Sequence, residues 1–177
     1  MPSRVRKLVL TAHVTSSVGW LGAATAYLGL VVGPLTSRDA RLVRAAYFAM
    51  EPITWLAIVP LALAALLTGV VQSLGTTWGL FRHYWVLFKL LLTVLATIIL
   101  LENTRTVSVL ASRARLSADA DVTGLQGQTL HASGGLLVLL VTTVLAVYKP
   151  RGLTEYGRRK QREQRNVPAV RRRERAP

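Results

Sequence analysis

Residues 10–29, LTAHVTSSVGWLGAATAYLG, lie within an apolar run that extends from Leu8 to Leu35. About 20 consecutive apolar residues allow a helix to cross the roughly 30 Å hydrocarbon core of a bilayer. The run therefore predicts a membrane-spanning helix. His13 interrupts this helix, and an ionisable side chain at membrane depth is costly, so it marks a candidate functional site.

Three further apolar stretches follow along the chain. They run from about Pro52 to Leu74, from Trp85 to Leu101 and from about His131 to Tyr148. Each approaches or exceeds the length that a membrane crossing requires. A net charge of +14 on a chain that is 51% hydrophobic fits a membrane protein with charged ends. We therefore predict an all-α membrane protein, an antiparallel bundle of four transmembrane helices.

The basic residues of the connections predict the orientation, because cytoplasmic connections carry an excess of Lys and Arg. With both termini inside, fifteen basic residues fall on the inner side and six on the outer side. The inner set comprises Arg4, Arg6, Lys7, Arg82 and eleven residues from Lys149 to Arg175; the outer set comprises Arg38, Arg41, Arg44, Arg105, Arg113 and Arg115. This asymmetry predicts an N-in/C-in topology.

The chain changes character near residue 150. Residues 1–150 are predicted to form one transmembrane domain, and residues 151–177 a basic, disordered cytoplasmic tail, because few groups there can build a core. The tail is interpreted as a topology anchor, or as a segment that binds anionic lipid headgroups with on the order of 1 kcal/mol per basic residue. Nucleic-acid binding is the weaker hypothesis, since only Tyr156 offers a ring for base stacking.

The connections carry their own patterns. Residues 38–50, RDARLVRAAYFAM, are amphipathic and predict a short helix on the outer interface. Glu51 precedes Pro52, which is typical of a helix that begins with proline. In the long outer connection, residues 107–116 are predicted to continue the third helix, and residues 117–128, SADADVTGLQGQ, to form a loop.

The first span has two different faces. One is partly polar and comprises His13, Ser17, Trp20, Ala24 and Tyr27. The other consists of small residues and comprises Gly19, Gly22, Ala23, Ala26, Gly29 and Gly33. Small residues allow helices to approach closely in membranes. We therefore predict that this helix packs through its glycines, and the same face suggests self-association or a membrane protein partner.

Polar side chains in the spans fall into two layers. The inner layer comprises His13, Gln72, His83 and Lys89, and the outer layer comprises Glu51, Glu102, Asn103, Arg105 and His131. His13 and Lys89 are candidates for cofactor binding; the alternatives are a structural hydrogen bond for His13 and snorkelling of Lys89 to the headgroups. Glu51 and His131 are candidate metal ligands, the alternative being a plain interfacial cap.

Haem is the cofactor that these histidines would suggest. Two histidines hold a b-type haem only when they lie at one depth, and His13 and His131 fall at opposite ends of the predicted bundle. His13 and His83 could share one depth, although His83 lies in a turn. Haem with a single ligand, or with none, therefore remains as a hypothesis. The chain has no cysteine, which excludes thiolate metal sites and cysteine nucleophiles.

A resemblance to known families rests on three motifs. HVTSSVGWLG (residues 13–22) places a His six residues before Trp-x-Gly, WVLFKLLL (residues 85–92) places a Lys four residues after a Trp, and Asn103 and Arg105 close that span. This arrangement resembles the four-helix membrane module of CopD-like copper-resistance proteins and HemJ-type protoporphyrinogen oxidases, although Leu87 stands where the latter have a second His. Over residues 7–160, ending in VYKPRGLTEYGRRK, the chain resembles an actinobacterial family of predicted integral membrane proteins.

These observations define three hypotheses. The first is a small polytopic protein of a bacterial plasma membrane that is not an enzyme and acts as a membrane partner or scaffold. The second, which the resemblance implies, is a haem- or porphyrin-handling or redox protein that uses His13 as a ligand or proton-transfer group and Lys89 to pair an anionic carboxylate. The third is metal handling, with copper as the implied ion, at the outer face through Glu51 and His131.

Overall fold

The computed structural model describes residues 2–37, 39–75, 80–116, 123–150 and 152–163. In these residues it contains four helical spans that are long and apolar enough to cross a membrane. The spans are Ser3–Thr36, Ala40–Gly75, Tyr84–Leu116 and Thr123–Tyr148. The predicted all-α fold with four long apolar helices is therefore confirmed.

The spans are built from five α-helices and two short turns of other helical types. The first span is α1 (Ser3–Val32) followed by a 3₁₀ turn, η1 (Gly33–Thr36). The second joins α2 (Ala40–Ile53), a π-helical turn, η2 (Thr54–Ile58), and α3 (Val59–Gly75). The third and fourth are α4 (Tyr84–Leu116) and α5 (Thr123–Tyr148).

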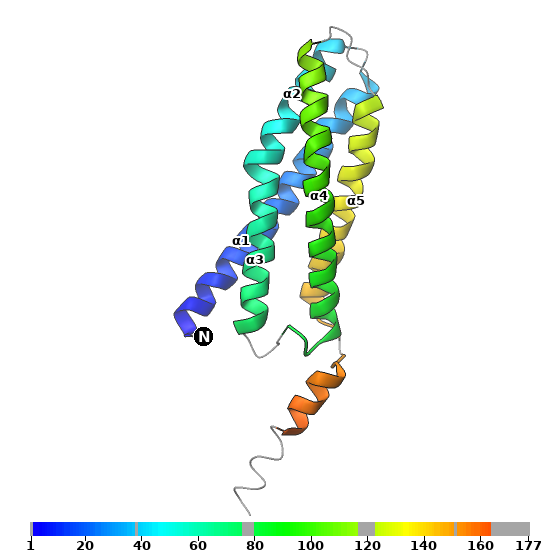
Figure 1. The fold of residues 1–177 in the computed structure, drawn as a ribbon. Helices are drawn as coiled ribbons and strands as arrows, with labels where there is room; N and C mark the ends of the chain where they lie inside the picture. The colour runs from blue at the N-terminus through cyan, green and yellow to red at the C-terminus, as the bar shows by residue number, and fades with distance from the viewer. Residues whose placement is uncertain (1, 38, 76–79, 117–122, 151, 164–177) are drawn as a thin grey trace, which may run out of the picture.

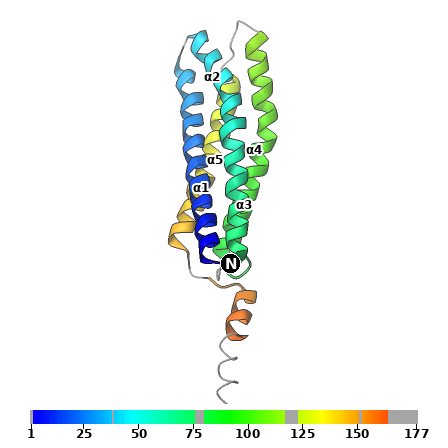
Figure 2. The same ribbon diagram turned by 90° about the vertical axis from the view of Figure 1, so that its left-hand side faces the viewer.

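The four spans pack side by side in an elongated bundle (Figure 1). α1 lies against α3 and α5, and α4 lies against α2, α3 and α5. Figures 1 and 2 place the N-terminus, the end of α3 and the start of α4 at one end of the bundle. The end of α4 and the start of α5 lie at the other end, beside α2. Side chains from all four spans therefore meet in the interior of the bundle.

The prediction of a separate interfacial helix before the second span is wrong. Pro52 lies inside α2 rather than at a helix start, and the helix continues through η2 into α3. The helix begins at Ala40 and is capped by Asp39, whose carboxylate accepts a hydrogen bond of 2.9 Å from the Arg41 backbone N–H. The apolar face of α2 packs inside the bundle instead of on lipid, because it contacts α1 and α4. Its buried residues are Val43, Ala46, Tyr47 and Met50.

The prediction that the first helix packs through its glycines is also wrong within one chain. A Cβ placed at Gly22, Gly29 or Gly33 would meet no atom of a packing neighbour within 4 Å, whereas a Cβ at Gly19 would meet Leu61. α1 instead buries Ser16, Trp20, Tyr27 and Val31. Large aromatic side chains bury far more apolar area than glycine, so they determine which face turns inward.

The connection between the third and fourth spans is shorter than predicted. α4 continues to Leu116, as the sequence indicated. Residues 117–122 lie outside the described residues, but residues 123–128, predicted as loop, form the first turns of α5. They belong to the helix because Leu125 is fully buried and Gln128 is only 2% exposed.

The chain after the last span is attached to the turn before α4. Within the predicted tail, residues 155–163 are helical, and residues 164–177 lie outside the described residues. The Thr154 backbone N–H donates to the Arg82 carbonyl at 3.0 Å, and the Tyr84 N–H donates to Gly152 at 3.3 Å. The Thr154 hydroxyl donates to the Phe81 carbonyl and accepts from the Gly157 N–H at 3.0 Å. This short helix therefore begins at a fixed point below the bundle (Figure 2).

Candidate functional site

Three helices meet around the side chain of His13. Its Nδ1 lies 3.1 Å from the Ala65 carbonyl oxygen and 3.2 Å from the Thr68 hydroxyl, both on α3. Its Nε2 lies 3.4 Å from Nζ of Lys89 on α4. The two residues that the sequence selected from separate spans are thus in contact. We call His13, Lys89 and their α3 neighbours Ala65, Thr68 and Gly69 the inner site.

α3 admits the imidazole because it carries a glycine at the point of contact. A Cβ at Gly69 would lie 3.0 Å from Cε1 of His13, which is closer than side chains normally approach. The Thr68 hydroxyl donates to the Ala64 carbonyl, so its hydrogen is already used. Nδ1–H of His13 therefore donates to the Ala65 carbonyl, and Nε2 presents its lone pair toward Lys89.

The charge of Lys89 has no acidic partner among the described residues. The ion pairs of that part of the chain join Glu51 to Arg115 and Glu163 to Lys160. Nearby on α3, Gln72 lies one turn beyond Thr68, and its side-chain carbonyl oxygen is buried without a hydrogen-bond donor. The inner site thus holds a cation without an acidic partner, and one helical turn away on α3 lies an acceptor without a donor. The fourth member of the predicted inner layer, His83, instead lies in the turn before α4, where its backbone bridges to Leu153.

The geometry of the inner site fits an acid group better than a haem iron. A histidine that donates through Nδ1 would bind iron through Nε2. Here Lys89 Nζ lies 3.4 Å from that nitrogen, in the space where an iron ligated by His13 would sit. The described residues therefore favour an anion beside Lys89 over a metal on His13.

A second polar cluster lies toward the other end of the bundle. The Tyr27 hydroxyl and the Asn103 side-chain amide each donate to the Gln128 carbonyl oxygen at 2.9 Å. Gln128 in turn donates to the Asn103 carbonyl oxygen at 3.1 Å. Gln128 is absent from the predicted outer layer, because the pattern of residues 117–128 predicts a loop. The signal was available, since Gln128 shares a helical face with Ala132 and Leu139, which are buried further along α5.

The two candidate metal ligands are not brought together into a site. Glu51 accepts a hydrogen bond of 2.9 Å from the guanidinium of Arg115, an ion pair in which the Arg115 side chain is 62% exposed. His131 instead lines a cavity between the helices. Among the described residues, no group of three or more His, Asp or Glu side chains is arranged to hold a metal ion. Glu51 also sits within a helix, not at the helix start that the sequence indicated.

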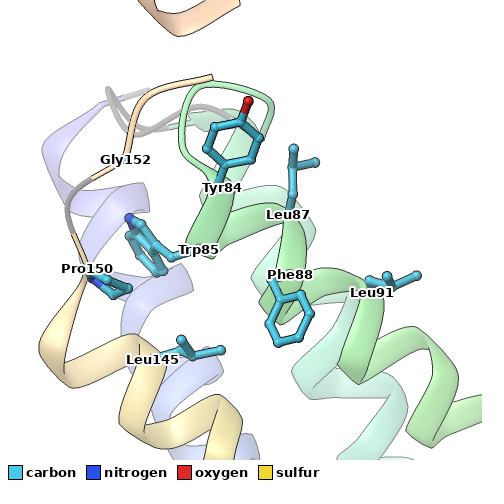
Figure 3. A pocket seen from close by; sticks show the side chains of 8 residues that line it. All are labelled: Tyr84, Trp85, Leu87, Phe88, Leu91, Leu145, Pro150 and Gly152. Carbon is cyan, nitrogen blue, oxygen red and sulfur yellow. The ribbon is translucent and has the colours of Figure 1, made fainter. Parts of the chain in front are cut away.

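Two hollows accompany these polar clusters. A cavity of about 340 Å³ lies between the helices in the half of the bundle that contains Gln128. An open apolar groove of about 470 Å³ lies at the opposite end, where α4 begins and α5 ends. Figure 3 shows its aromatic side chains Tyr84, Trp85 and Phe88 at the start of α4, with Trp85 directed toward Pro150.

Comparison of the chain with protein-family models, with curated proteins and with solved structures found no match.

Proposed function

We propose that this protein is a membrane binding protein, not an enzyme, that holds the acid group of an amphiphilic molecule at the inner site. The observation that carries the proposal is the contact of 3.4 Å between Lys89 Nζ and His13 Nε2, at a point where no described carboxylate pairs with Lys89. A cation among apolar helices is costly unless an anion or strong acceptor accompanies it. A carboxylate from the membrane would supply that anion.

The neighbouring groups are suited to hold such a ligand. The three-helix contact fixes the imidazole, so Lys89 has a rigid neighbour on one side. The Gln72 side-chain oxygen, which is buried without a donor, could accept a hydrogen bond from a protonated carboxylic acid. A porphyrin propionate and a fatty-acid carboxylate share this chemistry. Porphyrins are therefore one candidate class of ligand, bound through a propionate and not through an iron ligated by His13.

The location of the inner site follows from the proposed topology. We infer an antiparallel bundle in a bacterial plasma membrane with both termini in the cytoplasm, supported by fifteen basic residues on the inner side against six outside. The inner site then lies in the cytoplasmic half of the membrane, near the basic segment from Lys149 to Arg175. That segment would attract anionic headgroups to the same side. A partner or scaffold role stays a prediction, with the open face at Gly22 and Gly29 as the surface available to a second membrane helix.

The test compares acids with their esters. Protoporphyrin IX and oleic acid are titrated into the detergent-purified chain, each beside its methyl ester. We expect the acid of at least one pair to bind at least tenfold more tightly than its ester. Lys89→Gln is expected to weaken binding of that acid tenfold or more, about 1.4 kcal/mol per factor of ten.

The matched control is Lys7→Gln, which removes the same charge from an exposed position on α1. It should leave binding of the acid within twofold of the original chain. Equal binding of acid and ester, or equal losses in the two lysine variants, would contradict the proposal. Whichever acid is preferred identifies the apolar body that the site accepts.

A further inference from the structure

The cavity near Gln128 is enclosed by all four spans. Its volume of about 340 Å³ falls at the lower end of the roughly 300–1,000 Å³ typical of small-molecule sites. α1 contributes Trp20 and Tyr27, the π-helical turn contributes Thr54 and Ile58, and α5 contributes His131. Neither His13 nor Lys89 lines it, so this cavity is distinct from the inner site.

Two polar side chains on the cavity wall have no partner. Trp20 is 95% buried, and its indole N–H meets no acceptor among the described residues; the imidazole of His131 likewise makes no hydrogen bond there. The other polar groups on the wall are satisfied, since Tyr27 and Asn103 bond to Gln128 and the Thr54 hydroxyl donates to the Met50 carbonyl. A donor on a cavity wall that has no protein acceptor can bond to an acceptor placed inside the cavity. The cavity therefore calls for a ligand that accepts hydrogen bonds.

The charge and shape of the cavity wall restrict the chemical class of the ligand further. Among the described residues that line the cavity there is no Lys, Arg, Asp or Glu, so a neutral head group fits better than an ion. The rings of Trp20, Tyr27 and His131 offer flat faces, which pack well against another planar ring. A neutral, planar ring that carries carbonyl acceptors meets all three conditions.

We infer that the cavity opens sideways toward the surrounding lipid, between α4 and α5. Gly134 and Gly135 of α5 lie on its wall, and a Cβ at either position would meet nothing within 4 Å. Across from them on α4, Leu95 and Ile99 line the cavity while remaining about half exposed on the outside of the bundle. A hydrocarbon tail can therefore leave between α4 and α5 while the ring stays inside.

We propose that this cavity binds the ring of a lipid-soluble quinone. The quinone carbonyls accept hydrogen bonds from Trp20 and His131, the ring packs against the aromatic wall, and the tail extends into the membrane beside Gly134 and Gly135. The proposal concerns binding alone and does not depend on the function proposed for the inner site.

The experiment uses Trp20 as a reporter, because quinones quench tryptophan fluorescence on contact. In a background with Trp55, Trp78 and Trp85 replaced by Phe, Trp20 is the only emitting tryptophan. Decylubiquinone is titrated into this protein in detergent. We expect saturable quenching. Gly135→Leu, which fills the opening, should raise the half-quenching concentration tenfold or more, whereas Gly127→Leu on the same helix but outside the cavity should leave it unchanged.

A second variant tests whether misfolding, not loss of the site, weakens binding in Gly135→Leu. His131→Phe keeps a ring in the wall and removes its hydrogen-bonding nitrogens. In the otherwise natural chain, we expect this variant to need at least fivefold more decylubiquinone for the same rise in Tm. Lys89→Gln should leave that rise unchanged, which separates this proposal from the inner site. Quenching that is linear and identical in all variants would overturn the proposal, because it would mean that the quinone merely dissolves in detergent. Equal binding of methyl oleate would overturn the choice of a ring.

Discussion

Gln128 is the residue that holds three spans together in the half of the bundle away from the N-terminus. It is 2% exposed, and it bonds to Tyr27 on α1 and to Asn103 on α4. Its carbonyl oxygen accepts two hydrogen bonds, so removing this one side chain leaves two donors unpaired at once. A buried network of this kind is costly to break, because the groups left behind lose their partners without regaining water.

Replacing Gln128 by leucine is therefore expected to destabilise the protein. The free energy of unfolding in detergent should fall by about 1–3 kcal/mol, the usual cost of leaving buried polar groups unsatisfied. Thermal melting of the purified protein measures the change. Gln126→Leu, at an exposed position on the same helix, is the control and should stay within about 0.5 kcal/mol of the original chain. Equal effects of the two substitutions would show that the hydrogen bonds do not stabilise the bundle.

Among the elements, the segment that follows α5 has the most specific attachment. The Thr154 hydroxyl accepts a hydrogen bond from the Gly157 N–H, which caps the helix over residues 155–163, and it also donates to the turn before α4. Gly157 lies so close to the Arg82 carbonyl oxygen that a Cβ there would collide with it. Capping and attachment thus depend on the same hydroxyl group, so the helix and its anchoring should be lost together.

Thr154→Ala should loosen this helix without unfolding the bundle. Loss of a helix cap costs about 1 kcal/mol, which corresponds to a roughly fivefold larger population of the opened segment. Trypsin cleavage at Arg158, Arg159 or Lys160 should accelerate by about the same factor, because cleavage requires local opening. Thr25→Ala removes an exposed hydroxyl that bonds only within α1 and should leave the rate unchanged. An unaltered cleavage rate in Thr154→Ala would mean that the backbone contacts alone hold the segment.

The helices differ in how well the sequence predicts their boundaries. Long apolar runs predicted four spans because membrane length is a strong constraint. The start of the second span differs from the prediction, because Pro52 is typical of a first helical residue but here lies inside a helix that continues through a π turn. The start of α5 was missed because Gly124 suggested a loop. The glycine serves packing instead, as a Cβ there would lie 2.6 Å from the Tyr47 hydroxyl.

For the candidate sites, depth could be estimated from the sequence but partners could not. Equal distance from the inner surface correctly suggested that His13 and Lys89 lie near each other. Their contact also depends on Gly69, which makes room for the imidazole on a third helix. No spacing within one span indicates which face of another span it will meet. For the same reason, the pairing of Glu51 with Arg115 was not predicted.

In the whole molecule, the helices are longer than a bilayer is thick. The 33 residues of α4 rise about 50 Å at 1.5 Å per residue, against a hydrocarbon core of roughly 30 Å. Part of the bundle must therefore stand outside the hydrocarbon or tilt within it. The exposed ion pair between Glu51 and Arg115 marks an end of the bundle that lies outside the hydrocarbon, because exposed charged side chains are stable in water. By the inferred topology, this is the outer end.

The topology can be measured with introduced cysteines, because the chain has none of its own. Ser112→Cys lies at the emerging end of α4, and Ser3→Cys lies at the start of α1; both positions are exposed. A membrane-impermeant maleimide should label Ser112→Cys in intact cells and Ser3→Cys only after lysis. The reverse pattern would invert the inferred orientation and place the inner site in the opposite leaflet.

The gap beside Gly134 and Gly135 determines which concentration sets the occupancy of the cavity. An opening that faces the hydrocarbon is reached by diffusion in two dimensions, not from the aqueous phase. Occupancy would then follow the ratio of occupant to lipid molecules, and diluting the same membranes in more buffer would not empty the cavity. Adding lipid at a constant amount of protein and occupant would empty it, so the protein would respond to the composition of its membrane.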